Sequence, residues 1–119
     1  MEREVTWLLE MAVHPGEAET VHDLMAEMVA STRAEPGALS YAWYAGEDGA
    51  TVAVYKRYAD DGAALAHLAT FGERFAQRFL AALTPTRLTV FGAPGDAVQQ
   101  ALGAFTPSSL GIIGGFVAR

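Results

Sequence analysis

Two consecutive segments, Leu39–Ala45 and Thr51–Tyr58, are apolar on both of the faces that an extended chain presents. Their alternating aromatic and aliphatic residues predict two strands. The turn between them, Gly46–Gly49, contains an Asp-Gly pair, which is typical of a β-hairpin. An antiparallel sheet with one solvated face would instead alternate apolar with polar residues. We therefore expect both faces of this hairpin to be covered.

The segments around the hairpin predict an α+β, ferredoxin-like fold. Alternating apolar residues predict a strand over Glu4–Val13, and helical spacing predicts a helix over Glu17–Ala34. After the hairpin we expect a helical region over Gly62–Leu83, broken or kinked at Gly72, and a fourth strand around Arg87–Gly92. The order βαββαβ predicts an antiparallel sheet with its helices on one face.

At 119 residues we expect a single domain, 1–119, with a core of about 4–92 and a C-terminal extension over 93–119. The extension contains a short predicted helix near Asp96–Leu102 and a glycine-rich tail. Helices can cover only one face of the sheet, and a second copy of the chain is the simplest cover for the other. We therefore expect a homodimer through the sheet face, with the tail across the partner. The alternative is that the tail folds back over its own sheet.

Charge and composition argue against several classes of partner. Eight Lys and Arg stand against 14 Asp and Glu, so no basic stripe is expected to bind nucleic acid. Without cysteine, the chain has no thiol nucleophile and no disulfide. Apolar runs are shorter than the ~20 residues of a membrane span. No signal peptide is evident at the start. We expect a cytoplasmic protein that does not contact a membrane.

His67 is the histidine with the strongest claim to chemistry. It begins a series spaced by four residues that would align along one side of a continuous helix: His67, Phe71, Phe75 and Phe79. A histidine on an apolar face is usually a core residue with both nitrogens satisfied. The alternative is a pocket histidine that exchanges a proton near neutral pH. We expect His14 in a solvated loop and His22 at the border of an apolar stripe.

The aromatic residues of the hairpin divide between its two faces. Tyr41 and Trp43 share one face, and Tyr44 lies on the other. We expect Tyr41 and Trp43 to face the helices and Tyr44 to lie in the dimer contact. Such rings can wall a pocket for a planar ligand, but any half-buried sheet favours them as well.

Motifs for other chemistries are missing. No histidine and carboxylate cluster has metal-ligand spacing, and there is no nucleotide-binding glycine loop and no G-x-S-x-G elbow. Any chemistry would have to use acid–base groups, an apolar cavity and the reactivity of the substrate itself.

The stretches EPGALSYAWY and TVAVYKRYADDGAALAHLATFGERF resemble the antibiotic biosynthesis monooxygenase family of dimeric α+β barrels. That family shows E-P-G-x-x-x-Y at the turn into the second strand. Its third strand leads through an aromatic residue and an aspartate to an Ala-x-x-x-His helix. The matching residues are Glu35 to Gly37, Tyr41, Tyr58, Asp60, Ala63 or Ala64, and His67. The likeness covers roughly the first 92 residues.

The resemblance implies a homodimer whose pocket lies between sheet and helices. It also implies oxidation of a small aromatic ligand, a quinol or polyphenol, by molecular oxygen without flavin, haem or metal. By the same resemblance, His67 would be the catalytic proton acceptor or hydrogen-bonding partner. Tyr41, Trp43, Tyr58 and Phe71 would contact the substrate.

The sequence departs from the family at two positions. Lys56 stands where many members carry an acid, so any role of that acid is open here. Gln77 stands near the place of the histidine in a haem-degrading branch, which argues against haem. Two alternatives remain: a small-molecule-binding or catalytically silent dimer, and an isomerase of the same fold that uses His67 as its base.

Overall fold

The computed structural model describes residues 4–116 and 118. Along the chain the elements are β1 (Val5–Val13), α1 (Ala18–Arg33), β2 (Ala38–Ala45), β3 (Thr51–Tyr58), α2 (Asp61–Thr70), the π-helix η1 (Phe71–Phe75), α3 (Ala76–Ala82), β4 (Leu83–Phe91), α4 (Asp96–Leu102), the 3-10 helix η2 (Gly103–Phe105) and β5 (Ser108–Leu110). The sheet order is β2-β3-β1-β4-β5. The first four strands pair antiparallel, which confirms the predicted α+β, ferredoxin-like fold, and β5 adds to β4 in parallel.

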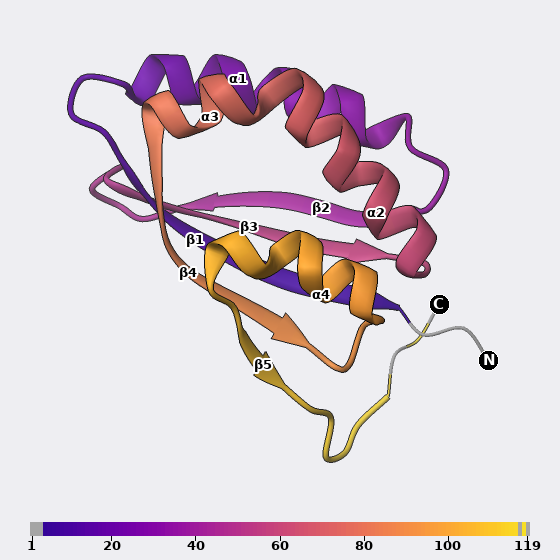
Figure 1. Cartoon of the computed structure of the whole chain (residues 1–119). Helices are drawn as coiled ribbons and strands as arrows, with labels where there is room; N and C mark the ends of the chain where they lie inside the picture. The colour runs from indigo at the N-terminus through magenta and orange to yellow at the C-terminus, as the bar shows by residue number, and fades with distance from the viewer. Residues whose placement is uncertain (1–3, 117, 119) are drawn as a thin grey trace.

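One face of the sheet carries the helices and the core. Figure 1 shows α1 and α3 side by side above the strands. Every second residue of the central strand β1 is buried beneath them: Val5, Trp7, Leu9 and Met11. The matching positions of β3 are Val52, Val54, Lys56 and Tyr58. This period of two is what an extended chain between a core and a second surface requires.

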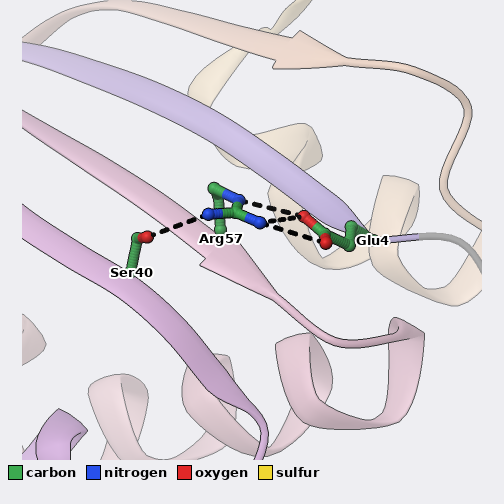
Figure 2. Close-up of polar contacts among 3 residues, drawn as sticks. All are labelled: Glu4, Ser40 and Arg57. Atoms are coloured by element: carbon green, nitrogen blue, oxygen red, sulfur yellow. Dashed lines mark hydrogen bonds and ion pairs between the residues drawn. The ribbon is translucent and has the colours of Figure 1, made fainter. Parts of the chain in front are cut away.

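The other face of the sheet has no cover in a single chain, and the sheet is open rather than closed into a barrel. Leu8 and Tyr55 pair across β1 and β3 on this face and are half-buried, whereas Tyr44 is 61% exposed. Figure 2 shows the polar group at its edge, where Arg57 donates two hydrogen bonds to Glu4 and one to Ser40.

The fourth strand differs from the prediction, whereas the second helical region is interrupted at the expected position, Gly72. The helical region is divided into α2, η1 and α3, with Gly72 inside the π-helical turn. β4 begins at Leu83 rather than near Arg87, because the chain pairs with β1 as soon as α3 ends. Pro85 is accommodated where the register with β1 shifts. The short strand β5 carries no sequence signal that predicted it.

The C-terminal segment packs on the helix side of the core. Val98 and Leu102 of α4 are buried, and α4 contacts α2. The backbone N–H of Gly95 donates to the Asp61 carboxylate at the start of α2, with 2.8 Å between nitrogen and oxygen. From the end of β5 onward the tail exposes its large apolar side chains: Leu110, Ile112, Ile113 and Phe116.

Candidate functional site

Strands β2 and β3 place their aromatic residues beneath the helices. Tyr41 pairs with Lys56 across the two strands, and Trp43 pairs with Val54. Since Val54 and Lys56 are buried on the helix side, Tyr41 and Trp43 lie on that side too, and Tyr44 lies on the open face. Tyr58 is completely buried. The hairpin therefore contributes its aromatic residues to both surfaces.

Helix α2 brings His67 onto these rings. Asp60 caps the helix by accepting the N–H of Ala63 at 2.8 Å, which fixes where the helix begins. His67 is 3% exposed, and its ring centre lies 5.0 Å from that of Tyr58 and 5.6 Å from that of Tyr41. Trp7 of β1 lies 6.5 Å away. The imidazole is thus enclosed by aromatic rings from three strands.

Glu35 orients this imidazole. His67 Nδ1 lies 3.1 and 3.2 Å from the two carboxylate oxygens of Glu35, in the turn after α1. A Cβ atom on Gly37 would overlap that of Ala63, so glycine allows this turn to approach α2 closely. A carboxylate accepts hydrogen bonds, which assigns the N–H of the imidazole to Nδ1 and leaves Nε2 as an acceptor.

Burial keeps the imidazole neutral. It lowers the pKa of His67 to about 3, and the positive charge of Lys56 adds to this lowering. Burial also raises the pKa of Glu35, while Lys56 opposes that shift. The contact between Glu35 and His67 is therefore a hydrogen bond from a neutral ring rather than an ion pair.

His67 and two of the rings around it, those of Tyr41 and Tyr58, carry buried polar atoms without partners. Within residues 4–116 and 118, four such side-chain atoms have no hydrogen-bond partner: Tyr41 Oη, Trp43 Nε1, Tyr58 Oη and His67 Nε2. Most buried polar groups in proteins are hydrogen-bonded, so a cluster of unpaired ones indicates a place for water or a ligand. All four residues were candidates from the sequence.

These atoms offer a ligand both donors and an acceptor. Burial raises the pKa of Tyr41 to about 12, with the neighbouring Trp43 and Thr32 side chains opposing the shift. Burial raises the pKa of Tyr58 above its ordinary value as well, and Glu35 and Tyr41 add to it. Both phenols therefore keep their protons at neutral pH. Together with the Trp43 N–H they are donors, and His67 Nε2 is the acceptor.

Two hollows lie near the rings that enclose His67, but the His67 side chain itself lines neither of them. A groove of about 240 Å³ lies between α1 and β2, and Tyr41 and Thr32 are among its lining residues. A partly open cavity of about 20 Å³ has Trp7, Lys56 and Phe71 in its wall. Such a cavity has room for about one water molecule. An aromatic ligand would have to displace the half-buried Phe71 or the α4–η2 segment above it.

Sequence reasoning missed part of this site. In the sequence, Glu35 is recognisable only as part of a turn motif. Its contact with His67 is not, because 32 residues separate the two. Lys56 was noted only as a departure from the family. It is 5% exposed and lies on the helix face.

The other two histidines lie outside the cluster. His14 lies in the loop after β1, as expected, and is half-buried there; its ring lies 2.9 Å from the Ala81 carbonyl oxygen and 2.6 Å from Thr84 Oγ1. These contacts tie the end of β1 to the start of β4. The His22 side chain is 75% exposed.

Within the described ranges, no three His, Asp or Glu side chains approach closely enough to hold a metal ion. None of the helices described here combines the length and apolarity that crossing a membrane demands.

The family model described as antibiotic biosynthesis monooxygenase matches residues 5–82. Curated protein sequences give no match. Among solved structures, MupZ from Pseudomonas fluorescens is similar with a TM-score of 0.86 at 20% identity, covering 99% of this chain and 91% of that one. SnoaB, a cofactor-independent oxygenase from Streptomyces nogalater, has a TM-score of 0.66 at 22% identity over 77% of this chain and 94% of its own. PA3566 from Pseudomonas aeruginosa has a TM-score of 0.62 at 25% identity over 76% and 91%. The likeness to MupZ therefore extends through the C-terminal segment.

Proposed function

The chain belongs to the antibiotic biosynthesis monooxygenase family, and from this premise we propose that it oxidises a small aromatic substrate, a quinol or polyphenol, with molecular oxygen and no cofactor. The observation that carries the proposal is the cluster of unpaired polar atoms around His67. Among the similar structures, SnoaB is named a cofactor-independent oxygenase, which supports the same class of reaction.

Each polar atom has a task in this reaction. His67 Nε2 accepts the hydrogen bond of the substrate hydroxyl, and the Glu35 carboxylate holds the ring in the tautomer that can do so. Tyr41 and Tyr58 donate to oxygen atoms of the substrate or of the reduced oxygen. The apolar surroundings exclude water from the intermediates.

The substrate supplies the electrons. A phenolate transfers one electron to O₂, and the resulting radical and superoxide combine at a ring carbon to give a peroxide. Loss of water from the peroxide, as its O–O bond breaks and the ring C–H is deprotonated, leaves a quinone. One phenol and one O₂ thus give one quinone and one water.

We propose further that the protein is a cytoplasmic homodimer that pairs through the open face of the sheet. Leu8, Tyr44 and Tyr55 supply apolar surface there. The exposed side chains of the tail, such as Ile113 and Phe116, would pack across the partner.

Oxygen uptake by metal-free protein with a panel of hydroquinones tests the enzymatic proposal. Uptake should exceed autoxidation for the wild type and fall to background for His67→Ala. His22→Ala is the matched control, because His22 is exposed on α1, and it should keep wild-type uptake. Uptake that survives His67→Ala contradicts the assigned role. Thermal stabilisation by the same ligands without any uptake would favour a binding module instead.

A further inference from the structure

Lys56 is a buried cation that the proposed reaction has not yet used. It lies on the helix face of β3, is 5% exposed with its Nζ atom not fully shielded from solvent, and makes no hydrogen bond or ion pair within the described part of the chain. Aromatic rings surround its Nζ atom, with ring centres at 5.4 Å for Trp7, 5.7 Å for Tyr41 and 5.9 Å for Phe71. Burial of a charge without an ionic partner destabilises a fold. A ligand that supplies the missing anion would remove this penalty.

The partly open cavity beside Lys56 is otherwise apolar. Its wall includes Leu9, Leu68, Phe71, Leu102 and Phe105. Lys56 is the charged member of that lining among the described residues. A cation in such surroundings interacts strongly with an anion, because little water screens the attraction.

The titratable groups that face Lys56 leave this position open for a ligand. Glu35 is the nearby acid that interacts with Lys56, but its carboxylate binds His67 Nδ1. Tyr41, Tyr58 and His67 are held in their neutral forms by burial. His67 with so low a pKa is also a weak base, so removal of a phenolic proton needs a group that stabilises the anion left behind.

We propose that Lys56 pairs with an ionised oxygen of the ligand, so that the site takes hydroxyaromatic compounds as phenolates rather than as neutral phenols. One phenolic O–H bond of the quinol or polyphenol breaks, its proton passes to solvent, and the anion is held by Lys56, while a second hydroxyl keeps its proton and donates to His67 Nε2. This inference rests on the proposed function, since it names the ionisation state of that same substrate. Lys56 is thereby a second catalytic residue, which lowers the cost of forming the electron-rich species that reacts with oxygen.

4-Nitrophenol is a suitable probe, because its anion is coloured and the nitro group protects the ring from oxidation by O₂. The absorbance of the bound probe is titrated with pH for the wild type and for Lys56→Met, which removes the charge and shortens the side chain by only one atom. Arg57→Met is the matched control, because Arg57 is the next residue and lies on the opposite face. The uncharged 4-nitroanisole reports on binding of the ring alone.

In the wild type, bound 4-nitrophenol should ionise at least one pH unit below the free compound, which is a tenfold preference for the phenolate. Lys56→Met should abolish this preference, Arg57→Met should retain it, and both should bind 4-nitroanisole like the wild type. An unshifted titration in the wild type, a shift that survives Lys56→Met, or no binding of the probe overturns the inference. If the protein consumes oxygen with hydroquinones but bound 4-nitrophenol ionises at the same pH as the free compound, the inference about Lys56 is wrong and the proposed function remains. If bound 4-nitrophenol ionises at a lower pH but no hydroquinone supports oxygen uptake, the proposed oxygenase activity is wrong and Lys56 remains an anion-binding residue.

Discussion

Lys56 and Arg57 are consecutive cations on β3, and the strand turns them to opposite faces of the sheet. Arg57 is paired with Glu4 through three contacts of 2.8 to 3.0 Å and also donates to Ser40. Lys56 is more deeply buried and has rings for neighbours in place of a carboxylate. The charge with less access to water is therefore the one without a salt bridge.

The same contrast extends to the two faces of the sheet. On the helix face, polar atoms of Tyr58 and His67 are buried without partners. On the open face, the polar group of Glu4, Ser40 and Arg57 is hydrogen-bonded, and apolar side chains such as Tyr44 are exposed. Unpaired polar atoms indicate a place for water or a ligand, because only a polar molecule can satisfy them. Exposed apolar side chains beside satisfied polar ones indicate a protein partner.

The largest expected effect is on kcat, and it distinguishes the carboxylate of Glu35 from that of Glu4. Glu35→Gln removes the charge that fixes the His67 tautomer and should lower kcat for hydroquinone oxidation about 100-fold, or about 3 kcal/mol, with little change in KM. Glu35→Asp should restore part of the rate. Glu4→Gln alters a carboxylate of the open face and should leave kcat within about twofold. Steady-state oxygen uptake measures all three, and equal losses for the Glu35→Gln and Glu4→Gln variants would remove the distinction between the faces.

The next effect concerns the open face itself. Tyr55 lies between Leu8 and Ala42 in the sheet register, near the middle of this face. Tyr55→Glu would bury a charge without a partner in the proposed dimer and should weaken it at least ~100-fold. Sedimentation at micromolar concentration should find a dimer for the wild type and for Tyr55→Phe, and a monomer for Tyr55→Glu. A wild-type monomer under these conditions would contradict the homodimer.

Replacement of Lys56 should stabilise the protein. Lys56→Met removes a buried charge while keeping an apolar side chain of similar length, so the free energy of unfolding should rise by about 2 kcal/mol at pH 7. Burial lowers the pKa of Lys56 from 10.5 to about 8, with Glu35 opposing the shift. Between these values the unfolded chain binds more protons than the folded one, so wild-type stability should increase as the pH rises from about 8 to 10.5.

The advantage of Lys56→Met should therefore shrink over the same pH range. Urea unfolding of both proteins at pH 7 and pH 10 measures it. A destabilised Lys56→Met variant would indicate that the ammonium has a partner in the folded state, which would contradict the description of Lys56 as an unpaired cation.

Much of this contrast follows from alternation in the sequence. The residues Val52, Val54, Lys56 and Tyr58 recur with a period of two, which is enough to place the lysine with the apolar set. The hairpin was predictable for the same reason, α1 from its helical spacing, and the ferredoxin-like fold from the order of these elements. The π-helical turn was not predictable, because no residue pattern specifies the extra residue in such a turn. Strand β5 was not predictable either, because no pattern in its three residues specifies that they pair at the edge of a sheet.

The site was predictable only in part. The family motif and the helical spacing identified His67 and its aromatic neighbours. The contact between Glu35 and His67 depends on the approach of a turn to a helix across 32 residues, which local patterns do not contain. The pairing of Arg57 with Glu4 spans 53 residues and was missed for the same reason.

The smallest expected effect is on the free energy of unfolding when the pairing of Arg57 with Glu4 is broken. Arg57→Met breaks a two-pronged contact whose side chains are 22% and 12% exposed, so the free energy of unfolding should fall by about 1 kcal/mol. Salt screens a partly exposed pair, so the difference from the wild type should narrow between 0.05 and about 1 M NaCl, as the Debye length shortens toward ~3 Å. Urea unfolding of the wild type and Arg57→Met in parallel with Lys56→Met provides the measurement. Both variants introduce a methionine, at neighbouring positions of one strand. A rise in the free energy of unfolding for Lys56→Met and a fall for Arg57→Met can therefore arise only from the different surroundings of the two side chains. If both substitutions change the free energy of unfolding in the same direction, the two faces differ in burial but not in whether they stabilise a positive charge.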